Sequence, residues 1–218
     1  MDSVPLPQGV FLSAEWLDLA MLNFSVDPAL LLPHVPAGTT LDSFDGKTYL
    51  SLVGFMFRKT KMFGTISVPF HSEFEEVNLR FYVYRTHGGE RRRGVVFIKE
   101  IVPKLAIALT ARLIYGENYV SLPMAHKISP AADHMEVEYA WRKGGQWQGL
   151  TARSEGAPHL PAENSLEQYI TEHYWGYARR HRRTLEYQVT HEPWRVWRCP
   201  QAGFEGNGGA LYGRLYSS

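Results

Sequence analysis

The sequence predicts a single domain over residues 1–218, of the α+β class, in which antiparallel β structure predominates and a few helices lie outside the sheet. Three observations lead to this prediction. Aromatic residues make up 13% of the chain, and they favour the pleated surface of a strand. Glycine-containing turn signals separate short apolar runs at Asp45-Gly46, His87-Gly88-Gly89 and Gly144-Gly145. Long helical patterning occurs only twice, whereas a parallel α/β fold would alternate helices with its strands.

In the first half of the chain, short strands predominate. Residues 15–26 are mostly apolar and fit a helix or a strand by periodicity alone. Asp27 followed by Pro28 has the form of an N-cap with proline at the first helical position, so we expect a short helix through about His34. Asp45-Gly46 is the strongest hairpin signal. The expected strands of this half are Thr40–Phe44, Thr48–Phe57, Phe74–Arg85 and Gly94–Ile101.

In the second half, helical patterning appears at two places. Pro103 begins a segment rich in Ala and Leu that runs to about Tyr115 and stops at the following glycine. Ser165, with Gln168 three residues later, forms a capping box, which predicts a helix of about four turns ending near Arg183. The expected strands of this half are Tyr119–Ile128, Met135–Arg142, a further strand after the Gly144-Gly145 turn, Thr184–His191 and Ala210–Tyr216.

The composition argues against several classes of protein. The formal net charge is +1, so no overall field would attract nucleic acid or anionic lipid. A single cysteine, Cys199, excludes an internal disulfide and multi-cysteine metal cages. No stretch approaches the ~18 apolar residues of a membrane span, and the N-terminus lacks the cationic region of a signal peptide. We therefore expect a cytoplasmic protein, with neither nucleic acid nor a membrane as partner.

Motifs that would indicate a known chemistry are incomplete. Gly46-Lys47-Thr48 resembles the end of a phosphate-binding loop, but the glycine required five positions earlier is a leucine. His173 and His181 are about two helical turns apart, too far for one small ion without other ligands, so no metal site and no cofactor are expected. Two basic clusters have structural explanations. Residues 91–93 fit a charged loop tip, and residues 179–183 fit cations at a helix C-terminus.

The segment Phe74–Arg85 contains the most informative pattern. Read with the period of two of a β-strand, it has an apolar face and a polar face. The apolar face consists of Val77, Leu79, Phe81 and Val83, and the polar face of Glu76, Asn78, Arg80 and Tyr82. An acid, an amide, a guanidinium and a phenol on one short strand suit a site for a small polar ligand. From the pattern alone, exposure of the polar face to solvent is the favoured explanation, and a ligand-binding face is the alternative.

Several stretches of sequence, in a fixed order, resemble a known family. They include residues 22–55, 74–84 (FEEVNLRFYVY), 111–124 (ARLIYGENYVSLPM) and 165–180, followed by HEPW at 191–194. The pattern resembles the YqjF-like family of bacterial proteins, which has no established reaction and belongs to the acetoacetate decarboxylase-like superfamily. The match covers most of the chain. The resemblance implies a cone-shaped antiparallel β-barrel with outer helices and an internal cavity.

The resemblance also indicates where a catalytic lysine would lie. Acetoacetate decarboxylase uses a Schiff-base lysine of lowered pKa, and its lysine pair follows a turn after the helix. The corresponding segment here is 115–120, in which Tyr119 and Val120 stand where the lysines would be, and no two lysines are adjacent anywhere in the chain. Without the amine no imine forms, so we expect no Schiff-base decarboxylation. Alternation places Lys99 on one face with Phe97, from which it could supply an amine from a different wall.

By the same resemblance, Glu76 corresponds to an acidic side chain in the decarboxylase cavity, and Asn78 and Arg80 match an Asn-Leu-Arg signature of the YqjF-like proteins. If this face points inward, Arg80 would bind a carboxylate bidentately and Asn78 would orient it. Glu76 is the candidate catalytic acid or base. Tyr82 and Tyr119 complete the expected ligand-binding set. Residues four apart on a strand are roughly 13 Å apart, so a direct pairing of Glu76 with Arg80 would need long side chains or a bulge.

Three classes of function follow from these residues. The first is an uncharacterised protein that binds a small organic acid, or a similar anion, in an internal cavity without Schiff-base chemistry. The alternative is an enzyme that acts on keto or hydroxy acids with Glu76 as acid or base. The third is a structural or partner-binding protein whose cavity is filled by side chains. Self-association into a homo-oligomer is left open. A pocket with Arg80 in its wall would separate the first two classes from the third, and turnover would separate the second from the first.

Overall fold

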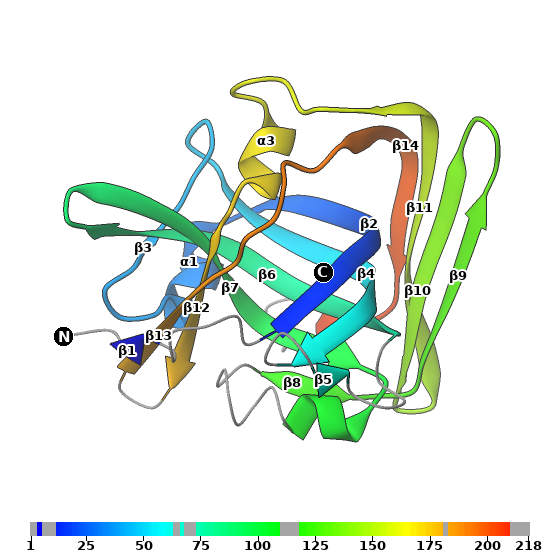
Figure 1. Ribbon diagram of the computed structural model, residues 1–218, viewed down its shortest axis with the longest axis horizontal. Coiled ribbons are helices and arrows are strands. Elements are labelled where there is room, and N and C mark those ends of the chain that lie inside the picture. The colour runs from blue at the N-terminus through cyan, green and yellow to red at the C-terminus, as the bar shows by residue number, and fades with distance from the viewer. Residues whose placement is uncertain are drawn as a thin grey trace.

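The computed structural model describes residues 4–5, 12–62, 66–67, 73–109, 118–180 and 183–209 (Figure 1). The helices are α1 (Pro28–Leu31), the 3-10 helix η1 (Leu32–His34), a helical segment at 105–109 and α3 (Leu166–Thr171), and residues 208–209 are also helical. The strands are β1 (Val4–Pro5), β2 (Leu12–Val26), β3 (Thr40–Leu41), β4 (Thr48–Met62), β5 (Ile66–Ser67), β6 (Phe74–His87), β7 (Glu90–Val102), β8 (Tyr119–Ser121), β9 (Met124–Pro130), β10 (Met135–Lys143), β11 (Gln146–His159), β12 (Trp175–Arg180), β13 (Arg183–Gln188) and β14 (Val196–Glu205).

The strands form two sheets. The large sheet has ten strands, with the path β1-β13-β12-β7-β6-β4-β2 and with β3, β5 and β8 paired beside it. The small sheet has four strands in the order β14-β11-β10-β9. Most pairs are antiparallel, and the parallel ones join β1 to β13, β12 to β7 and β7 to β8. The predicted mainly antiparallel fold with few helices is therefore confirmed. Among the described strands the path runs from β1 to β2 without pairing these two, so a closed barrel is not seen in this part of the chain.

The predicted turns lie where the sequence placed them. In the β6–β7 hairpin Gly88 and Gly89 have φ angles of +58° and +83°, and in the β10–β11 hairpin Gly144 and Gly145 have +60° and +84°. Two successive positive φ angles give the two-residue turn that matches strand twist, and glycine adopts them without strain. Asp45-Gly46 also turns tightly, but β3 pairs with β6 instead of β4. The expected hairpin arm Thr40–Phe44 is thus wrong beyond the turn.

The first helix was predicted correctly, including its cap. The side chain of Asp27 accepts a hydrogen bond from the backbone N–H of Ala29 at 2.8 Å, and η1 continues the helical path to His34. Residues 15–26, which fitted a helix or a strand, belong to β2. Helical residues at 105–109 agree with the helix expected from Pro103, whereas its second half lies outside the described residues. The strand expected at Ala210–Tyr216 lies outside them too.

The long helix expected from Ser165 is wrong in its length. It begins as predicted, because the backbone N–H of Gln168 donates to Oγ of Ser165 at 3.1 Å. It ends at Thr171, however, and residues 175–180 form β12, which pairs with β13 and β7. The alternation of Trp175, Tyr177 and Arg179 suits a strand, and sheet pairing buries the ring of Tyr177 completely.

The basic residues near the end of β12 consequently do not cap a helix. Arg179 Nη2 donates to the backbone oxygens of Pro33 and Val35, both at 2.9 Å. It therefore ties β12 to the chain that leaves η1. This contact replaces the helix C-terminus that the cluster at 179–183 was expected to complement.

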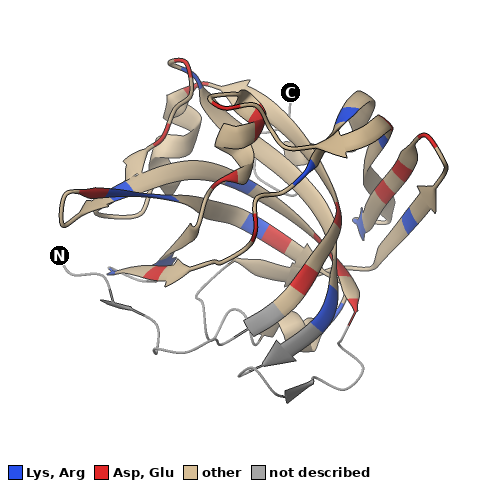
Figure 2. Cartoon of the chain, turned by 45° about the horizontal axis from the view of Figure 1, so that its top comes forward, with Lys and Arg blue, Asp and Glu red and all other residues tan. Residues whose placement is uncertain are grey.

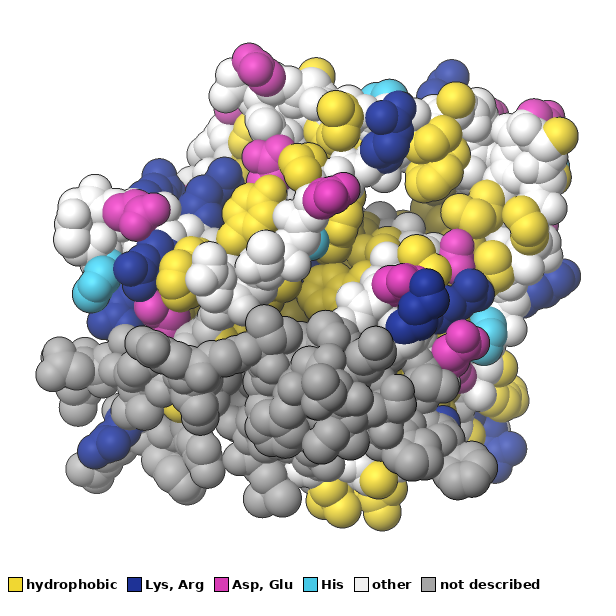
Figure 3. Space-filling view, viewed as in Figure 1, with side chains coloured by type: hydrophobic (Ala, Val, Ile, Leu, Met, Phe, Trp, Pro, Cys, Tyr) yellow, Lys and Arg dark blue, Asp and Glu magenta, His cyan; other side chains and the backbone are white. Residues whose placement is uncertain are grey.

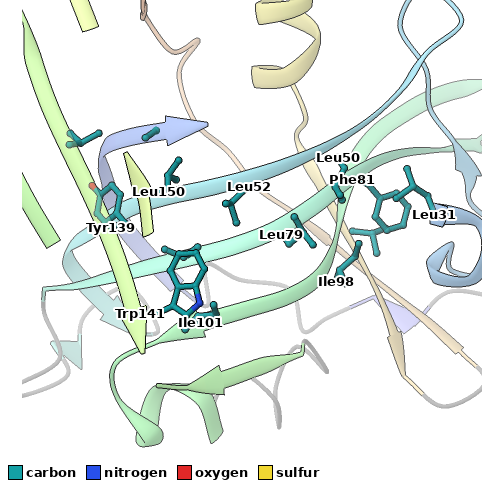
Figure 4. Packing of buried hydrophobic residues seen from close by; sticks show 14 of the residues in the cluster. Leu31, Leu50, Leu52, Leu79, Phe81, Ile98, Ile101, Tyr139, Trp141 and Leu150 are labelled. Carbon is teal, nitrogen blue, oxygen red and sulfur yellow. The ribbon is translucent and has the colours of Figure 1, made fainter. Parts of the chain in front are cut away.

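The main apolar core lies between the two sheets, with side chains of the large sheet facing those of β10 and β11 (Figure 4). The predicted apolar face of β6 belongs to this core. Its members are Val77, Leu79, Phe81 and Val83, and they share the cluster with Tyr139, Trp141 and Leu150 of the small sheet. That part of the prediction is confirmed.

Gly54 on β4 permits the close approach of the two sheets. A Cβ atom at this position would lie 2.5 Å from Cδ2 of Tyr139 and 3.1 Å from Cδ2 of Leu150. Because both side chains are fully buried, they have little room to move aside. We expect Gly54→Ala to lower the free energy of unfolding by about 1–3 kcal/mol, measured by urea denaturation.

Gly149→Ala on β11 is the matched control, because its nearest contact would be an ordinary 3.6 Å. Equal stability of the two variants would show that the sheets adjust to the added methyl group. The distance between them would then not depend on Gly54.

Charged residues of both signs are distributed over the chain, and the tip of the β6–β7 hairpin carries both (Figure 2). This mixture agrees with the formal net charge of +1. No helix within the described ranges is long and apolar enough to cross a membrane.

Candidate functional site

The polar face of β6 is buried. The strand lies between β4 and β7 in the large sheet, and none of its first ten residues is exposed. The exposed fractions on the polar face are 2% for Glu76, 3% for Asn78, 6% for Arg80 and 1% for Tyr82. The alternative of a solvated strand face is therefore wrong.

Two apolar groups cover this face. At the Glu76 end lies a cluster that includes the helical segment at 105–109, and its buried members are Val53, Phe55, Phe57, Phe74, Val102 and Ala108. At the Tyr82 end lie Tyr169 and Ile170 of α3, together with Val95 of β7. The polar side chains of β6 thus form a strip between aromatic and aliphatic groups, where the local dielectric is low.

Glu76 is held by two hydrogen-bond donors. Asn78 Nδ2 donates to Oε1 of Glu76 at 3.0 Å, and the hydroxyl of Tyr119 donates to Oε2 at 3.0 Å. Burial raises the pKa of Glu76 to about 7, although both hydrogen bonds and the charge of Arg80 favour the ionised form. A carboxyl group that titrates near neutrality can take up and release a proton at physiological pH.

A second buried carboxyl group, Glu100, was not predicted. It lies on β7, where its backbone pairs with Asn78 on one side and with Tyr119 on the other. Burial chiefly, followed by the carboxyl groups of Glu100 and Glu76, raises the pKa of Tyr119 well above its ordinary value. The Tyr119 hydroxyl, which donates to Glu76, therefore lies close to both carboxyl groups. A single acid within an apolar strand, VVFIKEIV, was the available signal.

Arg80 lacks a carboxylate partner in the described part of the chain. Its Nη2 lies 3.5 Å from the carbonyl oxygen of Ile170 and 3.9 Å from Sδ of Met21. Nε makes no hydrogen bond to the described residues, and none of their Asp or Glu oxygens lies within 4.0 Å of the guanidinium nitrogens. A buried charge with so few partners is costly.

The neighbouring arginines are paired, in contrast. Arg91 Nη2 and Arg93 Nε contact the two carboxylate oxygens of Asp42 at 2.6 and 3.0 Å, and Arg92 Nη1 contacts Glu186 at 2.9 Å. Residues 91–93 belong to β7, so the interpretation of this cluster as a charged loop tip was wrong. The pairing of these arginines makes the environment of Arg80 distinctive.

His173, which was not expected to bind a metal ion, lies close enough to Arg80 for the charge of Arg80 to act on it. Its buried ring is 4.7 Å from the ring of Tyr82, and Nε2 is 4.0 Å from Asp42 Oδ2. Burial, and then the charges of Arg93 and Arg80, lower the pKa of His173 well below its ordinary value. The imidazole is therefore neutral. No sequence pattern linked it to β6, since it follows α3 and reaches the site only through the packing of that helix.

Tyr82 has a structural partner. Its hydroxyl lies 2.6 Å from Oγ of Ser51, which also donates to Asn23 Oδ1 at 2.6 Å. The guanidinium carbon of Arg80 is 5.8 Å from the centre of the Tyr82 ring. Of the predicted site residues, the structure therefore brings Glu76, Asn78 and Tyr119 into direct contact, and it places Arg80 and Tyr82 further along the same strip.

Lys99 lies on the opposite face from the one predicted. The register shifts between Leu79 and Arg80, so that Leu79 pairs with Lys99 whereas Arg80 pairs with Phe97. This β-bulge at Ile98 reverses the alternation, and Lys99 consequently shares the side of Leu79. Burial, and then the charge of Lys143 on β10, lower the pKa of Lys99. The expectation that Lys99 shares a face with Phe97 is wrong.

A trough of about 550 Å³ lies across the small sheet, away from this strip. Lys127, Glu136 and Arg153 are among its lining residues, and Arg153 Nη1 is 2.9 Å from Glu136 Oε1. Exposed charges that pair with each other need no ligand. No three His, Cys, Asp or Glu side chains in the described ranges converge to hold a metal ion.

The surface is hollowed between α3 and β2, and hydrophobic side chains line the hollow (Figure 3). The two contacts of Arg80 belong to these elements, because Met21 is on β2 and Ile170 is in α3.

The two mainly antiparallel sheets with few helices match solved structures of the acetoacetate decarboxylase-like fold. The chain is similar to acetoacetate decarboxylase from Legionella pneumophila subsp. pneumophila str. Philadelphia 1, with a TM-score of 0.53, 14% identity, and coverage of 82% of this chain and 61% of that one. It is also similar to an acetoacetate decarboxylase-like enzyme from Sphingomonas wittichii RW1, with a TM-score of 0.54, 15% identity, and coverage of 84% and 68%.

A third similar structure is the enduracididine biosynthesis enzyme MppR, complexed with the condensation product of pyruvate and imidazole 4-carboxaldehyde. Its TM-score is 0.56 at 11% identity, with coverage of 77% of this chain and 61% of that one. The chain thus spans about three fifths of the length of two of these proteins, at 61% each. At such identities the likeness establishes the fold alone.

Residues 13–208 match the family DUF2071, described as "Uncharacterized conserved protein (COG2071)". The chain belongs to this family. It is also 27% identical over 197 residues to the uncharacterized protein YqjF of Bacillus subtilis (strain 168), which covers 88% of this chain and 78% of that protein. The resemblance predicted from the sequence is therefore confirmed.

Proposed function

We propose that this protein binds a small organic acid, with Arg80 holding the carboxylate, and that it does so as a cytoplasmic bacterial carrier or sensor without Schiff-base chemistry. The observation that carries the proposal is the buried guanidinium of Arg80, which has no carboxylate within 4.0 Å in the described part of the chain. The proposal takes the polar face of β6 as one wall of an internal cavity of the cone-shaped kind.

The energetics of a buried arginine support this function. Removing a guanidinium from water costs several kcal/mol, and one carbonyl contact at 3.5 Å offsets little of that cost. A ligand carboxylate would supply the opposite charge and two parallel hydrogen bonds. The proposal takes the hollow between α3 and β2 as the entry for the acid, because the guanidinium contacts one residue of each of these two elements. The three similar enzymes, one of them in complex with a pyruvate-derived product, support a ligand site in this fold.

The proposal is tested by titrating a panel of short keto, hydroxy and unsubstituted acids, followed by calorimetry. We expect saturable binding of one acid per chain. Because no lysine lies on the polar strip of β6, we also expect that borohydride added with a keto acid traps no covalent adduct, as checked by intact-protein mass spectrometry. Failure of every acid to bind would contradict the function. An adduct on Lys99, Lys104 or any other lysine would contradict the absence of imine chemistry.

A second candidate function is an enzyme that uses Glu76 as acid or base. The observation in its favour is the pKa of Glu76 near 7, which allows proton transfer at neutral pH. Turnover of a keto or hydroxy acid by the wild type, and its loss in Glu76→Gln, would establish this function over simple binding.

A further inference from the structure

We propose that the acid bound at Arg80 carries a hydrogen-bond donor, a hydroxyl or amino group, close to its carboxylate, and that Oδ1 of Asn78 accepts from it. This inference rests on the proposed function, because it specifies the class of acid that Arg80 binds. The observation behind it is that Asn78 Oδ1 is buried and accepts no hydrogen bond from the described residues. Buried polar atoms in folded proteins nearly always have a partner.

The orientation of the Asn78 amide follows from its neighbour. Oε1 of Glu76 accepts from Nδ2 of Asn78, and Oε2 accepts from Tyr119, so the carboxylate uses both oxygens as acceptors. An ionised carboxylate can only accept, so the NH₂ group of Asn78 must face it. The carbonyl oxygen of the amide consequently points away from Glu76. It is available for a donor from elsewhere.

The spacing along β6 puts this oxygen within reach of a small acid that extends from Arg80 toward Asn78. Asn78 and Arg80 are alternate residues of one strand on one face, so their Cα atoms are about 7 Å apart. Ile170 and the Tyr82 ring lie on one side of the guanidinium, so we place the acid on the other side, between the guanidinium and the Asn78 amide. A substituent on the carbon atoms next to the carboxylate would then meet an acceptor. The first acceptor is the Asn78 oxygen, and the Glu76 carboxylate lies beyond it.

This arrangement discriminates between acids. A keto oxygen cannot donate, and a methylene group offers nothing, so either would leave Asn78 Oδ1 unpaired in a buried site. A hydroxyl or amino group would satisfy it. Sites with a buried acceptor reject analogues that lack the donor, and we expect a preference of roughly tenfold to hundredfold in Kd.

The test compares matched acids that differ in one group. Lactate, alanine, pyruvate and propionate form one series, and 3-hydroxybutyrate, acetoacetate and butyrate form another. Kd values are measured by calorimetry at about pH 8, above the pKa of Glu76, with the wild type and with Asn78→Leu. We expect a hydroxy or amino acid to bind the wild type at least about tenfold more tightly than its keto and unsubstituted analogues. The lactate and alanine arms distinguish a hydroxyl donor from an amino donor. In Asn78→Leu the preference should vanish, while binding of the unsubstituted acid is retained.

Two outcomes would overturn the inference, and they are distinguishable. Equal affinities for keto, hydroxy and unsubstituted acids would remove the role of Asn78 but leave the proposed function intact. Absence of binding by every acid in both series would remove the proposed function and the inference together. The wild-type comparison decides even if Asn78→Leu fails to fold.

Discussion

Replacing Arg80 with leucine is expected to abolish acid binding and, at the same time, to stabilise the unliganded protein. The two effects have one cause. The guanidinium is buried beside Ile170 and Met21, with no carboxylate within 4.0 Å in the described chain, so its lost hydration is poorly compensated. Leucine removes that charge and packs against the same neighbours. We expect the free energy of unfolding to rise by roughly 1–3 kcal/mol, measured by urea denaturation without ligand.

The controls separate this effect from a general change of charge. Arg198→Leu removes a guanidinium that is 78% exposed, so it should alter neither stability nor binding. Arg80→Lys keeps the charge but loses the planar fork, and weakened binding without the gain in stability is expected. If Arg80→Leu instead destabilised the protein as a core truncation does, Arg80 would be a structural residue and the site would need another anchor.

The second large effect concerns pH and Glu76. The folded-state pKa of Glu76 is about 7, raised from an ordinary value near 4.5, so the folded protein binds this proton more tightly than the unfolded chain does. The resulting stabilisation is fully present below the unfolded pKa, and it is lost as the pH rises through the folded pKa. Over this interval we expect the wild type to lose roughly 2–3 kcal/mol of unfolding free energy relative to Glu76→Gln.

This difference is measured by urea denaturation of the wild type and Glu76→Gln at several pH values from the unfolded pKa near 4.5 to the folded pKa of about 7. The comparison with Glu76→Gln is needed because the lowered pKa of His173 acts in the opposite direction, removing stability as the pH falls. Glu163→Gln, at an exposed position, provides the control and should follow the wild type. If the difference in unfolding free energy between the wild type and Glu76→Gln did not change with pH, the carboxyl of Glu76 would titrate as it does in the unfolded chain.

The alternation on β6 was predictable because it depends on local chemistry alone. Four apolar residues and four polar ones at a period of two identified both faces, and the structure buries them as a core and a polar strip. The burial of the polar face was not predictable from periodicity, because a solvated face has the same pattern. Only the packing of α3 and of the segment at 105–109 decides between the two alternatives.

The failures had different physical causes. The composition of residues 172–180 suits the continuation of a helix. Pairing with β13 and β7 nevertheless stabilises residues 175–180 more as a strand, and helix propensity, which depends on local sequence, does not include such pairing. The position of Lys99 depended on a one-residue bulge, which reverses a face without altering the sequence pattern. The strand β14 was missed, because most of its residues are exposed and it pairs with β11 from a distance in the chain.

Some residues of the candidate site were predictable from the sequence and others were not, for a related reason. Glu76, Asn78 and Arg80 lie on one strand, so one pattern identified all three. Glu100 and His173 join them only through the pairing of β7 and the packing of α3. A site built from one strand can be recognised in the sequence, whereas a site assembled from several elements cannot.

The elements that cover the polar strip also determine when, during folding, its charged side chains are buried. The meander β4–β6–β7 is joined by pairings between neighbours in sequence, so these strands can associate early at a small loss of loop entropy. The parallel pairing of Trp175 with Gly94, and the contacts of Tyr169 with Tyr82, join distant parts of the chain and are expected late. Until then Arg80 remains hydrated, whereas Glu76 can be covered earlier by the segment at 105–109, which follows β7 directly in the chain. The cost of dehydrating the guanidinium therefore falls on the final docking of α3 and β12, when most of the chain is already committed to its native topology.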